Sequence, residues 1–118
     1  MAVVEEQNSD AEGPLIFSCL NCRTIIGDSF SLVCTNRGLN SITLSKAHSI
    51  AKLEDLITSR DSIDLGSTYF PVKCSFCDAI LGRFYITTPK ALDEIREHFT
   101  FMMDFLSSYE VTPRGNNK

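Results

Sequence analysis

Four cysteines in two Cys-x-x-Cys pairs are the residues of this chain best suited to chemistry. The pairs are Cys19/Cys22 and Cys74/Cys77. Two cysteines three positions apart can direct both thiolates at one ion, and two such pairs supply the four sulfur ligands that a structural Zn²⁺ prefers. One pair alone is also typical of redox chemistry, but two pairs in matched surroundings favour a metal. The pattern therefore predicts one structural zinc ion per chain, held by these four cysteines.

The two pairs lie in a repeat. Residues 19–30 and 74–85 share the pattern Cys-x-x-Cys-x-x-Ile-[Ile/Leu]-Gly-x-x-[Phe/Tyr], at an offset of 55 positions. We refer to residues 19–24 as knuckle one and to residues 74–79 as knuckle two. The apolar pair after each knuckle is expected to anchor it in a core. The glycines that follow, Gly27 and Gly82, predict a bend, a bulge or tightly packed backbone.

Reduced core cysteines, or two disulfides in a secreted protein, are the alternatives to a metal site. The first residues, Met-Ala-Val-Val-Glu-Glu, have neither the basic nor the apolar region of a signal peptide. Five cysteines is an odd number, which fits a disulfide framework poorly and fits four ligands plus one spare thiol well. The sequence therefore predicts a reducing compartment, the cytosol or the nucleus.

Cys34 is the spare thiol, and two histidines are the remaining candidate ligands. Cys34 could be the nucleophile of an enzyme similar to a methionine sulfoxide reductase, or a small core residue on a face shared with Phe30 and Leu32. Neither a histidine nor a basic cluster adjoins it to lower the thiol pKa, so the core role is favoured. His48 and His98 are not needed as ligands where four thiolates are available, and both are expected to lie elsewhere.

Composition limits the class of protein. The chain has 118 residues, 43% hydrophobic content, a net charge of −4 and a pI near 5.0, which suits one globular domain. A nucleic-acid binder usually shows a basic stripe with stacking aromatics, and here the basic residues are scattered. No apolar run approaches the roughly 18 residues that span a bilayer. A zinc ribbon that binds nucleic acid stays open as the alternative class, whereas the lack of tryptophan disfavours an aromatic ligand cage.

The elements that must position the knuckles are short strands. Alternation of apolar residues and turn signals predict strands at residues 15–17, 29–35, 39–45, 67–73 and 84–87. The second and third of these form a hairpin around the turn at 36–38. Residues 49–60 fit either a helix or a strand with a loop, and Pro71 favours an edge strand. A short helical turn is expected over 89–97, followed by extended structure over 99–111.

The predicted organisation is a single folded unit between two polar ends. Residues 1–14 are acidic and close on Gly13-Pro14, and residues 112–118 are polar, so both are expected to be flexible tails. The domain is expected to occupy residues 15–111. A metal that closes a loop of more than about 50 residues within such a small domain would contribute much of its stability.

The residues around the knuckles carry a resemblance. Ile-Ile-Gly-Asp-Ser follows knuckle one at 25–29. Ile-Leu-Gly-Arg-Phe-Tyr follows knuckle two at 80–85, and Thr88-Pro89-x-x-Leu92-Asp93 comes after it. Over residues 16–111 this combination resembles the Mis-eighteen family, the centromere-licensing proteins that carry a yippee-type zinc domain. Family members usually continue into a C-terminal helical region, whereas this sequence ends in a polar segment at Lys118.

The resemblance implies a fold and a role. The fold is mainly β, with two antiparallel sheets packed across each other, a zinc-binding apex and little helix. By resemblance the domain is not an enzyme but a homo- or hetero-oligomerisation module in the nucleus, at the centromere or kinetochore. Its complex marks centromeres for loading of the histone variant CENP-A. The zinc ligands implied by position are again Cys19, Cys22, Cys74 and Cys77.

Overall fold

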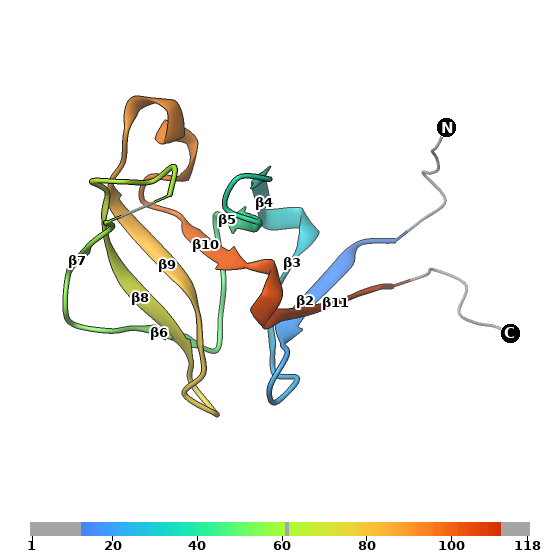
Figure 1. Ribbon diagram of the computed structural model, residues 1–118. Coiled ribbons are helices and arrows are strands. Elements are labelled where there is room, and N and C mark those ends of the chain that lie inside the picture. Colours follow the sequence, from blue (N-terminus) through green and yellow to red (C-terminus); the bar gives the residue numbers. More distant parts are fainter. Residues whose placement is uncertain (1–12, 61, 112–118) are drawn as a thin grey trace, which may run out of the picture.

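The chain folds into two antiparallel sheets of unequal size (Figure 1). The computed structural model describes residues 13–60 and 62–111. The predicted tails, 1–14 and 112–118, lie almost entirely outside the described residues. The small sheet has the order β11-β2-β3, and its strands are β2 (Leu15–Cys19), β3 (Ile25–Asp28) and β11 (Leu106–Glu110).

The larger sheet has the order β4-β5-β10-β9-β8-β6, with β7 also paired to β8. Its strands are β4 (Leu32–Asn36), β5 (Ser41–Leu44), β6 (Ile50–Lys52), β7 (Ile57–Thr58), β8 (Thr68–Cys74), β9 (Ile80–Thr87) and β10 (Phe99–Met102). Among the described residues the helices are three short 3₁₀ segments, η1 (Ser29–Ser31), η2 (Lys90–Ile95) and η3 (Met103–Phe105). The predicted mainly β fold, with two antiparallel sheets and little helix, is confirmed.

One hydrophobic core joins the two sheets. Phe17, Ile26 and Leu106 enter it from the small sheet, and Leu44 and Phe101 are among those that enter it from the large sheet. Cys19 and Cys74, the first cysteine of each knuckle, belong to the same buried cluster. The apex that carries the cysteines is therefore built directly on the core.

Each knuckle connects two antiparallel strands in the same register. In the small sheet Phe17 pairs with Gly27, and in the large sheet Val72 pairs with Gly82. The pairing register shifts immediately after Phe17 in the β2–β3 hairpin and immediately after Val72 in the β8–β9 hairpin. The two hairpins therefore carry an irregularity at the same position of the repeat. The internal repeat seen in the sequence is thus a repeat of a bulged hairpin, and the predicted bulge near each glycine is confirmed.

The strand predicted over residues 29–35 is only half right. The Asp28 carboxylate accepts a hydrogen bond from the Phe30 N–H at 3.0 Å and caps η1, so the strand begins only at Leu32. The segment turns here because the chain leaves the small sheet and enters the large one. The alternation predicts a face shared by Phe30 and Cys34. This part of the prediction is wrong, because Phe30 is 81% exposed. The hairpin of β4 and β5 is confirmed.

Pro71 does not mark an edge strand, because β8 is paired on both sides. Its inner neighbour is β9, and its outer side pairs with β6 and β7. The Pro71 carbonyl accepts from the Leu53 N–H at 2.8 Å, which shows that this backbone unit faces the outer side. The outer partner is interrupted between β6 and β7 at this point, so the missing proline N–H breaks no regular ladder. The ambiguous segment 49–60 forms these two short strands.

The C-terminal segment follows its prediction with one addition. The helical turn appears as η2, and extended structure begins at Phe99. The addition is η3, which separates β10 of the large sheet from β11 of the small sheet. No helix among the described residues is long and apolar enough to cross a membrane.

A buried carboxylate ties the loop before β8 to the large sheet. Asp64 is fully buried and accepts hydrogen bonds from Tyr85 Oη at 2.5 Å and Ser59 Oγ at 2.7 Å. Arg83 Nη1 lies 2.6 Å from Asp64 Oδ2, the same oxygen that Tyr85 bonds, and balances the charge of the carboxylate, whereas Ser59 bonds Oδ1. Burial of Tyr85, and next the hydrogen bond to Asp64, raise the pKa of that phenol. The network is fully paired, which is the condition under which a buried charge is tolerated.

Replacing Asp64 with alanine is expected to lower the free energy of unfolding by about 3 kcal/mol, because it leaves a buried phenol and a guanidinium without their acceptor. Urea titration monitored by circular dichroism would measure the loss. Asp104, an exposed carboxylate that accepts from Asn40 at 3.3 Å, provides the control. Its alanine variant should stay within about 0.5 kcal/mol. Equal effects at the two positions would contradict the structural role given to Asp64.

Candidate metal centre

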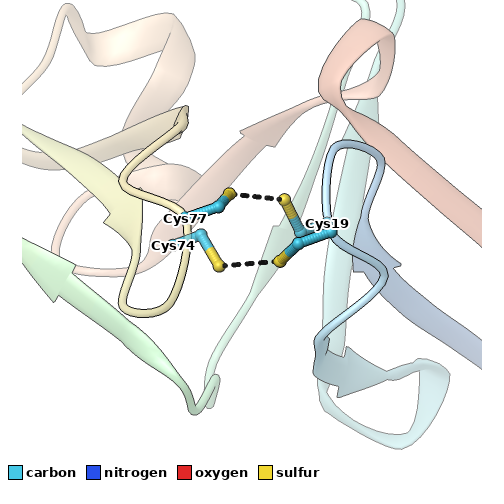
Figure 2. Close-up of side chains that lie close together, drawn as sticks. Cys19, Cys74 and Cys77 are labelled. Atoms are coloured by element: carbon cyan, nitrogen blue, oxygen red, sulfur yellow. Dashed lines mark hydrogen bonds between the residues drawn. The ribbon is translucent and has the colours of Figure 1, made fainter.

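The four cysteines of the two knuckles converge at the apex between the sheets (Figure 2). Their sulfur atoms all lie within 4.8 Å of one another. Two contacts cross from one knuckle to the other: Cys19 Sγ lies 3.5 Å from Cys77 Sγ, and Cys22 Sγ lies 3.5 Å from Cys74 Sγ. Residues 58 and 52 positions apart in the sequence thus meet at one point.

This spacing fits a tetrahedral zinc ion. With zinc–sulfur bonds of about 2.3 Å, the sulfur atoms of a tetrahedron lie about 3.8 Å apart. The two measured cross-knuckle distances are close to that value. The donor set consists of soft thiolate sulfur, which selects zinc over the hard cations that prefer oxygen. Four ligands leave no open position, which is typical of a structural rather than a catalytic ion.

The backbone prepares both knuckles in the same way. In knuckle one, the Cys19 N–H donates to the Thr24 carbonyl at 2.9 Å, and the Arg23 N–H donates to the Cys19 carbonyl at 2.7 Å. In knuckle two, the Cys74 N–H donates to Ala79 at 2.9 Å, and the Asp78 N–H donates to Cys74 at 3.0 Å. These are the same bonds shifted by one repeat, so two loops that share only their cysteines build the same ligand frame.

The left-handed residue of each knuckle is not the glycine. Arg23 has φ of 68° and Asp78 has φ of 66°, at equivalent positions immediately after the second cysteine. Gly27 and Gly82 are not among the positive-φ residues, so their role is close packing and not left-handed backbone. The residue types indicate this only weakly, because aspartate is enriched in left-handed backbone among non-glycine residues but arginine is not.

Replacing Arg23 with glycine is expected to raise the free energy of unfolding by about 0.5 kcal/mol. The gain comes from removing a left-handed side chain, which costs about 1–2 kcal/mol, less the greater entropy that glycine loses on folding. Arg37→Gly, at an exposed turn residue without positive φ, should instead destabilise. Thermal unfolding of the zinc-loaded variants would separate the two. A loss of stability in Arg23→Gly equal to that in Arg37→Gly would contradict the assignment.

The four thiols differ in their surroundings. Burial raises the pKa of Cys19 to about 11, whereas a hydrogen bond from the Thr24 side chain lowers the pKa of the exposed Cys22 to about 6. A hydrogen bond from the Asn21 side chain lowers the pKa of Cys77. Because zinc binds thiolates, a buried thiol such as Cys19 must release its proton when metal enters, which couples metal affinity to pH.

The other candidate residues lie outside this cluster. Cys34 packs beside Leu39 and Tyr69 against a second, smaller core cluster. Burial, and then Glu94, raise the pKa of the Cys34 thiol, which opposes a nucleophilic role. His48 is exposed and His98 is half-buried. Of the described residues that could hold a metal, only the four knuckle cysteines come together in a group of three or more.

The comparisons with known proteins agree with this geometry. Residues 15–118 match the family described as Yippee zinc-binding/DNA-binding/Mis18, centromere assembly. The chain belongs to this family. The resemblance drawn from the knuckles and the residues after them is therefore confirmed.

Several relatives of this Yippee-Mis18 chain are known. It is 37% identical over 108 residues to the kinetochore protein mis18 of Schizosaccharomyces pombe, covering 86% of this chain and 55% of that protein. It is 36% identical to the protein Mis18-alpha of Rattus norvegicus, covering 91% and 48%. The crystal structure of a Mis18 "Yippee-like" domain superposes with a TM-score of 0.77 at 35% identity, covering 83% of this chain and 97% of that domain. The chain thus spans about half the length of these full-length relatives.

The zinc prediction is confirmed at the level of the family. The zinc-binding character of the Yippee-Mis18 family and the four-sulfur cluster together support one structural Zn²⁺ per chain. When bound, that ion would supply four strong bonds between the two sheets, at a site that the backbone of both knuckles already frames.

Proposed function

We propose that this chain is a non-enzymatic, zinc-stabilised interaction module that works in the nucleus at the centromere. We assign Cys19, Cys22, Cys74 and Cys77 as the ligands of its zinc ion. The convergence of these four sulfurs from two different sheets carries the proposal. A closed four-thiolate site leaves no position for a substrate, so its role is to hold a shape that other proteins recognise.

The apex also offers a surface suited to contact. Leu20, Ile80 and Phe105 are each close to half exposed, and they line a cavity of about 270 Å³ beside the metal site. Phe76, at the tip of knuckle two, is 74% exposed. Exposed apolar groups gathered in one region are typical of protein interaction sites. The cavity takes residues from both knuckles, so its shape depends on the metal that joins them.

Similarity to kinetochore protein mis18 and Mis18-alpha supports the cellular role. We infer that the chain forms homo- or hetero-oligomers with other centromere-licensing proteins, and that this assembly serves the loading of CENP-A. We further propose that residues 15–111 form the folded unit. A net charge of −4 argues against direct binding to phosphate backbones, although the family description includes DNA-binding proteins.

Two measurements test this function. Light scattering after size exclusion should show an oligomer, or a complex with a candidate centromere protein, at micromolar concentration. A strict monomer without affinity for such proteins would contradict the proposal. In dividing cells, the tagged chain should coincide with a centromere marker, and Cys74→Ser should abolish that signal while Cys34→Ser keeps it. A DNA gel shift that weakens steeply with salt would favour the nucleic-acid alternative instead.

A further inference from the structure

The two knuckles share a backbone frame but differ in the side chains around the sulfurs. In knuckle one, Thr24 Oγ1 lies 3.1 Å from Cys22 Sγ, within hydrogen-bonding distance. The equivalent position in knuckle two is Ala79, which has no hydroxyl. The backbone part of the pattern is repeated, because the Cys19 N–H donates to the Thr24 carbonyl and the Cys74 N–H donates to the Ala79 carbonyl, each at 2.9 Å. The hydroxyl is therefore an addition made in one copy only.

We propose that Thr24 is a positioning residue of the metal site, and that its hydroxyl holds Cys22 as a zinc ligand. The inference rests on the proposed assignment of the four cysteines as ligands. Four thiolates around Zn²⁺ carry an excess of negative charge, and donors to the sulfurs disperse that charge through charge-assisted hydrogen bonds. Such donors orient the ligands, and losing one typically costs 10- to 100-fold in metal affinity.

Cys22, whose sulfur Thr24 contacts, is the ligand that packing holds least. Cys19 and Cys74 are buried in the core cluster, so packing fixes their side chains. Cys77 is half-buried, whereas Cys22 is exposed. The Thr24 hydroxyl therefore supplies to Cys22, by hydrogen bonding, the order that the core supplies to the buried pair.

Zinc competition with a chromophoric chelator, performed on the full chain, tests the inference. Thr24→Val keeps the shape but removes the hydroxyl, and it should weaken zinc binding about 10- to 100-fold. Thr24→Ser retains a hydroxyl and should bind zinc as the unmodified chain does. Thr35→Val, at an exposed strand position outside the site, is the matched control and should leave zinc affinity unchanged.

Cobalt substitution provides a readout that a general loss of stability does not move. The sulfur-to-metal charge-transfer bands of the Co²⁺-loaded chain should shift in Thr24→Val but not in Thr35→Val. Wild-type zinc affinity and unshifted bands in Thr24→Val would overturn this inference alone. Equal weakening in Thr24→Ser and Thr24→Val would overturn the role given to the hydroxyl. An unmodified chain that binds no zinc would overturn the ligand assignment and this inference with it.

Discussion

Replacing Cys74 with serine should leave the chain unable to hold zinc and unable to fold cooperatively. Cys74 ends β8, is fully buried in the core that joins the two sheets, and lies 3.5 Å from Cys22 across the knuckles. Structural zinc sites contribute about 10–16 kcal/mol of apparent binding energy in small zinc-finger peptides. The net stability of a domain is about 5–15 kcal/mol. Loss of one ligand from a site of this kind is therefore expected to remove most of the stability of this small domain.

Circular dichroism and elemental analysis of the purified variant would measure the outcome. The unmodified chain should carry one zinc per protomer and unfold in a single transition, which a strong chelator should abolish. Cys34→Ser is the matched control, because it also removes a thiol but lies in the second core cluster. It should keep the metal and lose only a modest amount of stability. A folded Cys74→Ser variant, or a folded unmodified chain without bound metal, would refute the stabilising role given to the zinc site.

The four candidate ligands could be predicted from the sequence because the Cys-x-x-Cys motif occurs twice in matched surroundings. A repeat of thiols at fixed spacing is a local signal, and it identified all four cysteines that the structure brings together. The pairing of particular sulfurs across the knuckles is a long-range property of the two sheets, and no local pattern encodes it. The contact between the Thr24 hydroxyl and Cys22 could not be predicted for a related reason. Residue 24 is a position at which the two copies differ, whereas the repeat pattern consists of the residues that they share.

The strands could be predicted where apolar and polar residues alternate along the whole strand. The predictions were wrong where the chain passes from one sheet to the other. Residues 29–31 alternate like a strand, yet the Asp28 cap turns them into η1 at the crossing between sheets. The 3₁₀ turn η3 lies at the return crossing, from β10 to β11. Pro71 was misjudged because its neighbour strand is broken beside it, a fact about residues 53–56 that the proline itself does not reveal.

Gly82 lies directly against the backbone of β10, and its replacement by alanine is expected to cost more than about 4 kcal/mol. A Cβ at this position would lie 2.0 Å from the Thr100 carbonyl oxygen and 2.8 Å from the Phe101 Cα. Both atoms belong to the backbone of β10, which pairs with β9 at this point and is fixed by β5 on its other side. Relief would require β10 to move away from the hairpin that carries knuckle two.

Gly27 occupies the equivalent position of the first copy and gives a matched control for this prediction. A Cβ there would meet the Leu44 Cδ1 at 2.8 Å, which is the end of a flexible side chain and not a strand backbone. Overpacking of this kind costs about 1–3 kcal/mol, so Gly27→Ala should be clearly milder than Gly82→Ala. Chemical denaturation of the zinc-loaded chains would compare the two. Equal losses of unfolding free energy would mean that both glycines are needed for the bulged hairpin itself, and would contradict the prediction. A large loss in Gly82→Ala alone would show that close packing of β9 against β10 is what requires the glycine.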